Sequence, residues 1–180
     1  MDRIRLATVW MGGCSGCHMS FLDLDEWLID LHQKADLVFS PVVDTKEYPE
    51  NVDVVLIEGA ICNEDHLELI HQIRARTKTI VAFGDCAVTG NVTALRNPLG
   101  KAEHVLQRAY IDCADLNPQI PAEKGIVPLL LDRVMPVHEV VPVEYYLPGC
   151  PPPADHIKAL LAQLLDGKEP KLAGSQIKFG

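Results

Sequence analysis

The chain has 180 residues, of which 48% are hydrophobic, and this is enough to bury the core of one domain. Its 16 Lys and Arg residues stand against 25 Asp and Glu residues, which gives a net charge of -9. Such an acidic chain repels phosphate backbones and anionic lipid, so neither nucleic acid nor a membrane surface is expected as a partner.

The first residues, Met-Asp-Arg-Ile-Arg, contain no apolar signal core, no cleavage site and no paired arginines. No apolar run approaches the length that spans a bilayer. We therefore expect a cytoplasmic protein. In that reducing compartment six cysteines are expected to be metal ligands, catalytic thiols or buried apolar residues rather than disulfides.

Strand and helix patterns alternate through the first half of the chain. Apolar, partly β-branched runs predict buried strands at 4–10, 36–43, 53–58 and 79–84. Helical spacing of apolar residues predicts an amphipathic helix over 21–31, and Asn63 predicts the start of another that runs through Arg76. This order implies an α/β fold with a parallel sheet, helices on both faces and ligand chemistry at the carboxyl ends of the strands.

Periodicity weakens in the second half. A short helix is expected over 102–110, an ordered loop over 112–125 and a last strand within 137–147. A strong apolar stripe over 157–165 predicts a final helix, which Gly167 ends. We expect one domain over 1–180, with a regular α/β part (1–95), a loop-rich part (96–150) and a C-terminal helix and tail (151–180).

Four cysteines lie in glycine- or proline-rich turns at the ends of different predicted elements: Cys14, Cys17, Cys86 and Cys150. Thiolates on loops that converge from separate elements suit a 4Fe-4S cluster, because each iron takes one soft sulfur ligand from the protein. The proline after Cys150 also matches the Cys-Pro of ferredoxin motifs. Cys62 and Cys113 lack such a setting and are expected to be buried, small apolar residues.

The cysteine pattern alone leaves three other kinds of site possible. A thioredoxin-like dithiol accounts for Cys14 and Cys17 but leaves Cys86 and Cys150 without a role. A zinc-stabilised interaction protein would favour compact paired motifs, whereas here the third and fourth cysteines are single and far apart. FMN on this chain would require a phosphate cradle after the first strand, where the sequence has cysteines instead.

Glycines surround the candidate ligands, namely Gly13, Gly16, Gly84 and Gly149. We expect their backbone to approach the sulfurs closely and to direct N–H groups at them, which raises the reduction potential of a cluster. The alternative is that they are ordinary turn glycines.

Glu58 and His18 are two further candidates near the same end of the sheet. Glu58 ends a predicted buried strand, and we expect it to assist proton movement or to contact a partner; the alternative is an exposed carboxylate or a helix cap. His18 follows Cys17 and either modulates the potential or is a surface or packing residue.

Taken together, these segments resemble the small subunit of nickel-iron hydrogenases, most closely that of the cytoplasmic, bidirectional NAD(P)-reducing type. The likeness extends from about Val9 to Leu165. It is carried by Cys14-Ser15-Gly16-Cys17-His18, Ile57-Glu58-Gly59-Ala60-Ile61, Gly84-Asp85-Cys86-Ala87 with Gly90, and Gly149-Cys150-Pro151-Pro152.

The resemblance implies a flavodoxin-like domain that holds one proximal 4Fe-4S cluster through Cys14, Cys17, Cys86 and Cys150. It implies an electron-transfer subunit of a hydrogen:NAD(P)+ oxidoreductase, with the nickel-iron centre on a large subunit and FMN and NAD(P) on diaphorase subunits. Periplasmic and membrane-bound relatives add an export signal and a domain with two further clusters, neither of which is expected here. Residues 97–136 and the acidic helix after Cys17 are the expected partner contacts.

A cluster-carrying subunit of a respiratory NADH:quinone oxidoreductase is the alternative relative. In that family the first motif has adjacent cysteines, whereas Ser15 and Gly16 separate the pair here. The Glu58-Gly59-Ala60 segment also favours the hydrogenase resemblance.

Overall fold

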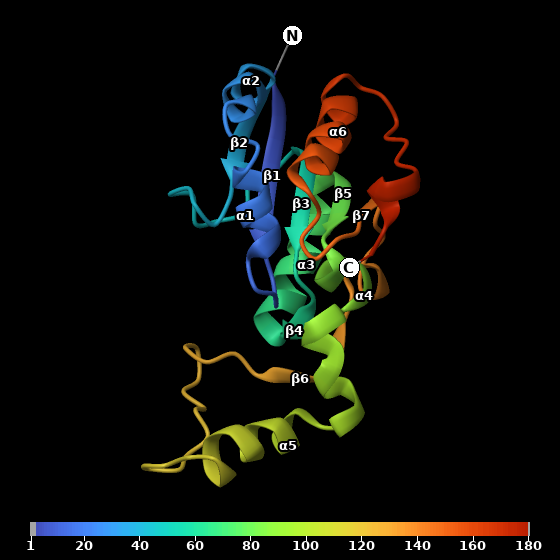
Figure 1. Ribbon diagram of the computed structural model, residues 1–180. Helices are drawn as coiled ribbons and strands as arrows, with labels where there is room; N and C mark the ends of the chain where they lie inside the picture. The colour runs from blue at the N-terminus through green and yellow to red at the C-terminus, as the bar shows by residue number, and fades with distance from the viewer. Residues whose placement is uncertain (1–2, 180) are drawn as a thin grey trace.

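A five-stranded parallel sheet forms the centre of the computed structural model, which describes residues 3–179 (Figure 1). The strand order is β2-β1-β3-β5-β7. The order changes direction between β1 and β3, as in flavodoxin-like sheets, so the predicted α/β fold is confirmed. The strands are β1 (Ile4–Trp10), β2 (Ala35–Phe39), β3 (Val52–Glu58), β5 (Thr77–Phe83) and β7 (Tyr145–Leu147).

Helices cover both faces of this sheet because its central strands are apolar on both sides. One core joins strand residues such as Leu6 and Leu56 to Phe21 of α1, Leu31 of α2 and Leu160 of α6. The opposite core joins the alternate strand residues to helices α3 and α4. The helices are α1 (Gly16–Leu22), α2 (Trp27–Lys34), α3 (Glu64–Arg76), α4 (Asp85–Thr89) and α6 (Ala154–Leu165).

A second, smaller unit projects from the main body near the carboxyl ends of the strands (Figure 1). It contains an antiparallel pair, β4 (Ile61–Asn63) and β6 (Leu130–Met135), together with helix α5 (Ala102–Gln107). Arg96 donates to the carbonyl of Leu131 at 2.7 Å, which ties the segment before α5 to β6. Short helical turns complete the chain: η1 (Asn91–Leu99), η2 (Arg108–Asp112), η3 (Val137–Glu139) and η4 (Gly174–Ile177).

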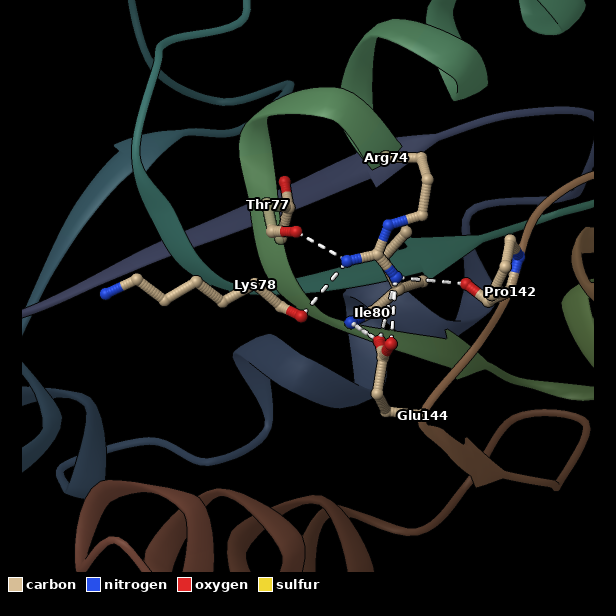
Figure 2. A network of polar contacts seen from close by, with 6 residues as sticks. All are labelled: Arg74, Thr77, Lys78, Ile80, Pro142 and Glu144. Atoms are coloured by element: carbon tan, nitrogen blue, oxygen red, sulfur yellow. Dashed lines mark hydrogen bonds and ion pairs between the residues drawn. The ribbon is translucent and has the colours of Figure 1, made fainter.

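One polar network holds the edge of the large sheet (Figure 2). The guanidinium of Arg74, at the end of α3, donates to both carboxylate oxygens of Glu144 at 2.9 and 3.0 Å. It also donates to the carbonyls of Thr77, Lys78 and Pro142. Glu144 in turn accepts the N–H of Ile80 at 2.7 Å. The network therefore anchors the segment that leads into the edge strand β7 to both α3 and β5.

Several expected elements agree closely with the structure. Strands β1, β3 and β5 lie where apolar runs predicted them, and Asn63 caps α3 by accepting the N–H of His66 at 2.8 Å. Gly167, with φ +67°, follows the last helix as expected, and its N–H donates to the carbonyl of Leu164.

Other expectations were wrong. The single helix over 21–31 is two helices separated by a turn in which Asp25 has φ +48°, a left-handed conformation that interrupts a helix. β2 ends at Phe39 instead of continuing to residue 43. The last strand expected within 137–147 is present as β7, but it covers only Tyr145–Leu147, and residues 137–143 contain the short turn η3. β6 was not predicted at all. No helix within residues 3–179 has the length and apolar content needed to cross a bilayer.

Candidate iron-sulfur site

Four neighbouring strands end side by side at the carboxyl edge of the sheet. In the register of the sheet Trp10 pairs with Glu58, Glu58 with Phe83, and Phe83 with Leu147. The chain then leaves β1 toward Cys14 and Cys17, β5 toward Cys86, and β7 toward Cys150. The cysteines that are distant in the sequence therefore follow strand ends that are adjacent in space.

The first loop turns sharply into a short helix. Ser15 has φ +68°, and α1 begins at the next residue, so that Cys14 precedes the helix and Cys17 lies in its first turn. Cys17 is buried, whereas Cys14 is exposed. The hydroxyl of Ser20 in α1 donates to the carbonyl of Pro152 at 2.5 Å, which connects this helix to the loop that carries Cys150.

The loops after β5 and β7 are joined by backbone and side-chain hydrogen bonds. The N–H of Gly84 donates to the carbonyl of Leu147 at 2.8 Å, and the N–H of Asp85 donates to the carbonyl of Gly149 at 2.9 Å. The Asp85 carboxylate accepts the N–H of Gly149 at 2.6 Å. These contacts fix the segment before Cys86 against the segment before Cys150.

The four thiols act on one another electrostatically. Burial raises the pKa of Cys17 well above its ordinary value, and negative charge on Glu58, Cys86, Cys14 and Cys150 raises it further. Four thiolates in so small a space repel one another, and a cluster of iron ions is what relieves such repulsion.

Two backbone N–H groups lie close to Cys86. Burial raises its pKa, and so does negative charge on Cys150 and Cys14. The nearby backbone N–H groups of Thr93 and Val92 act in the opposite direction and lower the pKa. These two donors stabilise a thiolate there and were not predicted from the sequence.

The glycines differ in how they serve the site. A Cβ on Gly84, whose φ is +84°, would lie 2.2 Å from the Cys17 sulfur, and one on Gly16 would lie 3.3 Å from the Cys14 sulfur. The N–H groups of Gly84 and Gly149 donate to the Leu147 carbonyl and the Asp85 carboxylate, so they are not directed at sulfur. Close approach of backbone to sulfur, rather than N–H donation, is what Gly84 and Gly16 offer.

Gly13 occupies a similarly narrow space. A Cβ there would lie 3.4 Å from Cα of Gly59 and 3.8 Å from Oε1 of Glu58. The loop after β1 therefore runs directly over the end of β3.

Glu58 is buried rather than exposed, so the alternative of a solvent-facing carboxylate was wrong. Its Oε2 accepts the N–H of His18 at 2.9 Å, and its Oε1 accepts the N–H of Cys17 at 3.3 Å. The same Oε2 contacts Nδ1 of His18, which is itself buried. Glu58 at the end of β3 thus caps the first turn of α1, so the alternative of a helix cap is confirmed.

Two more residues near the sulfurs escaped prediction. The side-chain amide of Asn91 donates to the Cys150 sulfur at 3.5 Å. Asp85 joins the Cys86 and Cys150 loops, as described above. Neither contact has a local sequence signal, because each depends on the pairing of loops that lie about sixty residues apart.

The two remaining cysteines are not proposed ligands, although Cys62 lies beside the loop after β1, where a Cβ on Gly12 would approach its sulfur to 2.1 Å. Cys62 is partly buried, its pKa is raised mainly by burial, and its thiol donates to the carbonyl of Ala60 at 3.3 Å. Cys113 is exposed, so the expectation that it is buried was wrong.

The donor set fits an iron-sulfur cluster, because it consists of four thiols that follow neighbouring strand ends. Within residues 3–179, no group of three or more His, Cys, Asp or Glu side chains has the compact arrangement that binds one metal ion. A cubane separates its ligands more widely than a single zinc ion does, because each sulfur binds a different iron.

A separate apolar cavity of about 300 Å³ lies between α1, α2, β1 and β2. None of the cysteines lines it, and the buried Nε2 of His18 has no hydrogen-bond partner among the described residues. The apolar lining of the cavity includes Leu6, Trp10, Phe21, Leu28 and Leu37.

Comparison with known proteins places this arrangement among hydrogenase subunits. The chain is 36% identical over 172 residues to the NAD-reducing hydrogenase HoxS subunit delta of Cupriavidus necator, covering 92% of this chain and 80% of that protein. It is 40% identical over 184 residues to a subunit of the F420-non-reducing hydrogenase of Methanothermobacter marburgensis, covering 98% of this chain. It spans only 58% of the length of that second relative.

A solved NAD+-reducing NiFe hydrogenase in the H2-reduced state contains a chain of the same fold. The TM-score is 0.94 at 39% identity, with 99% of this chain and 100% of that chain covered. The family model described as NADH ubiquinone oxidoreductase, 20 Kd subunit, matches residues 14–164, which include all four candidate ligands. The chain therefore belongs to the NADH ubiquinone oxidoreductase 20 Kd subunit family.

Proposed function

We propose that this chain is the electron-transfer small subunit of an NAD(P)-reducing nickel-iron hydrogenase and carries one proximal 4Fe-4S cluster. The ligands are Cys14, Cys17, Cys86 and Cys150. The observation that carries the proposal is their convergence: these cysteines follow the aligned ends of β1, β5 and β7, although up to 136 residues separate them in the sequence.

The comparisons support the hydrogenase assignment within the broader family. Relatives that match more than nine-tenths of this chain bear hydrogenase names, and the solved chain of TM-score 0.94 belongs to an NAD+-reducing enzyme.

The residues of this chain hold, shield and tune the cluster. A bound cluster supplies one-electron transfer. Burial of Cys17 excludes water from one side of it, while the nearby N–H groups of Val92 and Thr93 stabilise the Cys86 thiolate and raise the reduction potential. Hydrogen is split on a large subunit, and electrons leave toward a diaphorase module that contains flavin and iron-sulfur groups.

Two surfaces are proposed to contact those partners. Large apolar side chains are exposed on the projecting unit, among them Leu95, Leu116 and Ile126. Another exposed apolar group lies on and beside α1, including Met19 and Leu22. Apolar surface of this kind is typical of proteins that bury it in a stable complex.

The proposal is tested by anaerobic co-purification from cells that express the chain with its neighbouring genes. We expect a nickel-containing subunit and a flavin-containing subunit to accompany it, and the complex to reduce NAD+ or NADP+ with H2. A complex that contains a quinone-reducing membrane module and no nickel would contradict the proposal.

A cluster-carrying subunit of an NADH:quinone oxidoreductase is the second candidate, since the family model bears that name. The spaced Cys14-Ser15-Gly16-Cys17 motif and the Glu58-Gly59-Ala60 segment favour the hydrogenase assignment. The co-purification above separates the two.

A further inference from the structure

Helix α1 begins without a cap of its own. It spans only Gly16–Leu22, and Ser15, the residue before it, makes no side-chain hydrogen bond to the first turn. The first N–H groups of a helix have no partner inside the helix, and burying one unpaired is costly. Here Cys17 and His18 are both buried, so their N–H groups require an acceptor from elsewhere in the fold.

Glu58 supplies that acceptor from another element. It is 2% exposed at the end of β3, 40 residues from His18 in the sequence, and its two oxygens accept the N–H groups of His18 and Cys17. Burial of a carboxylate is costly unless several donors satisfy it, and these two N–H groups together with Nδ1 of His18 do so.

His18 completes the arrangement. Its ring packs edge-on against Trp10, with the ring centroids 5.2 Å apart, and against Phe83. Its Nε2 has no hydrogen-bond partner within residues 3–179, so the contact with Glu58 is what orients the ring by hydrogen bonding. The carboxylate and the imidazole therefore fix each other within the apolar surroundings.

The position of the Cys17 sulfur depends on this backbone. The sulfur lies against Gly84, where a Cβ would approach it to 2.2 Å, and Gly84 is two residues before Cys86. A small rotation of the first turn of α1 would drive the Cys17 sulfur into the loop after β5 or withdraw it from the other thiols. The geometry of the ligand set is consequently sensitive to the cap.

We propose that Glu58, oriented by His18, is a positioning residue: by holding the backbone of Cys17 and His18, it fixes the Cys17 sulfur among the cluster ligands. This inference rests on the proposed function. It assigns to β3, the one strand among the four aligned ends that leads to no proposed ligand, the task of setting the geometry of the ligands that follow its neighbours.

The test compares three variants of the complete complex, purified anaerobically: Glu58→Gln, Glu58→Ala and Asn63→Ala. The control is matched, because Asn63 caps α3 by accepting the N–H of His66 and is not a cluster ligand. The measurements are the rate of iron loss to a chelator, the EPR g-values and midpoint potential of the reduced cluster, and the melting temperature.

We expect Glu58→Ala to lose iron about tenfold faster than the wild type and to show altered g-values, as removal of groups that orient ligands does at other metal sites. Glu58→Gln keeps one acceptor oxygen. It should lose iron faster than the wild type but more slowly than Glu58→Ala, and its midpoint potential should differ from that of the wild type. Asn63→Ala should melt earlier with its cluster spectrum unchanged, which separates positioning from a general loss of stability.

Wild-type iron retention, g-values and potential in both Glu58 variants would overturn the inference while leaving the cluster assignment intact. A wild-type chain without any cluster would instead refute the proposed function. If Glu58→Ala fails to assemble, Glu58→Gln still decides, through its potential and through hydrogen exchange of the Cys17 and His18 amides, which should become faster.

Discussion

The Cα of Gly84 lies directly against the sulfur of Cys17, although 67 residues separate the two in the sequence. A Cβ at this glycine would lie 2.2 Å from the sulfur, well inside van der Waals contact. The backbone there also has φ +84°, which side chains rarely adopt. The loops after β1 and β5 can therefore pack this closely only because residue 84 has no Cβ.

Replacement of Gly84 by Ala should therefore displace Cys17 and abolish or strongly reduce cluster content. Gly125→Ala is the matched control, because Gly125 also has a positive φ, +82°, but no atom lies within 4 Å of the position of a Cβ. Both variants lose about the same backbone freedom. Iron and sulfide analysis should distinguish them, and equal cluster content in the two would contradict the proposed packing.

The assignment of ligands predicts a second contrast. Cys150→Ala should eliminate the intact 4Fe-4S spectrum, since one iron loses its protein ligand. Cys113→Ala should leave the spectrum unchanged, because Cys113 is an exposed residue of the projecting unit. EPR of the dithionite-reduced variants checks both outcomes, and the reverse pattern would refute the ligand set.

Arg74 is expected to contribute to stability without affecting the cluster. Arg74→Ala removes donors to Glu144 and to three carbonyls, and should lower the free energy of unfolding by about 1–3 kcal/mol, after allowance for partial solvent screening. Lys168→Ala removes an exposed pair with Asp166, which solvent screens, and should leave the free energy of unfolding nearly unchanged. Urea unfolding measures both, and similar values for the two would show that the network in Figure 2 is not stabilising.

The raised pKa of Tyr48 predicts that the protein loses stability at high pH. Burial raises its pKa from 10.0 to about 12, against the lowering effects of Thr77 and Arg74. Above pH 10 the unfolded chain releases this proton while the folded chain retains it, so the free energy of unfolding should fall between pH 10 and about 12.

Tyr48→Phe should remove that part of the alkaline decline, although it also removes the 2.6 Å hydrogen bond to Thr77 and lowers stability at neutral pH. Tyr110→Phe is the control, because Tyr110 is exposed. Urea unfolding from pH 8 to 12 provides the comparison. An unchanged slope in Tyr48→Phe would contradict the prediction.

The regular half of the fold was predictable because its signals are local. Buried parallel strands such as β3 are continuous apolar runs, and Asn63 caps its helix through residues three positions away. The turn at Asp25 was missed because apolar spacing continues across it, and β6 was missed because its burial depends on pairing with β4, some seventy residues earlier.

The candidate site shows the same difference between local features, which were predicted, and contacts between distant residues, which were not. The sequence alone indicates all four cysteines, since the glycine- and proline-rich turns that carry them are local features. The contacts that position them are not local: Glu58 reaches Cys17 across 41 residues, and Asp85 reaches Gly149 across 64. Such contacts follow from the order of the strands, which brings β1, β3, β5 and β7 together at their carboxyl ends.

The most direct test of the central claim is 57Fe Mössbauer spectroscopy of the complex, labelled with 57Fe in this chain alone and kept free of oxygen. We predict the signature of a single 4Fe-4S cluster bound by this subunit, which reduction by one electron converts to a paramagnetic state. Iron absent from the labelled chain, or zinc bound to its cysteines, would contradict the cluster assignment.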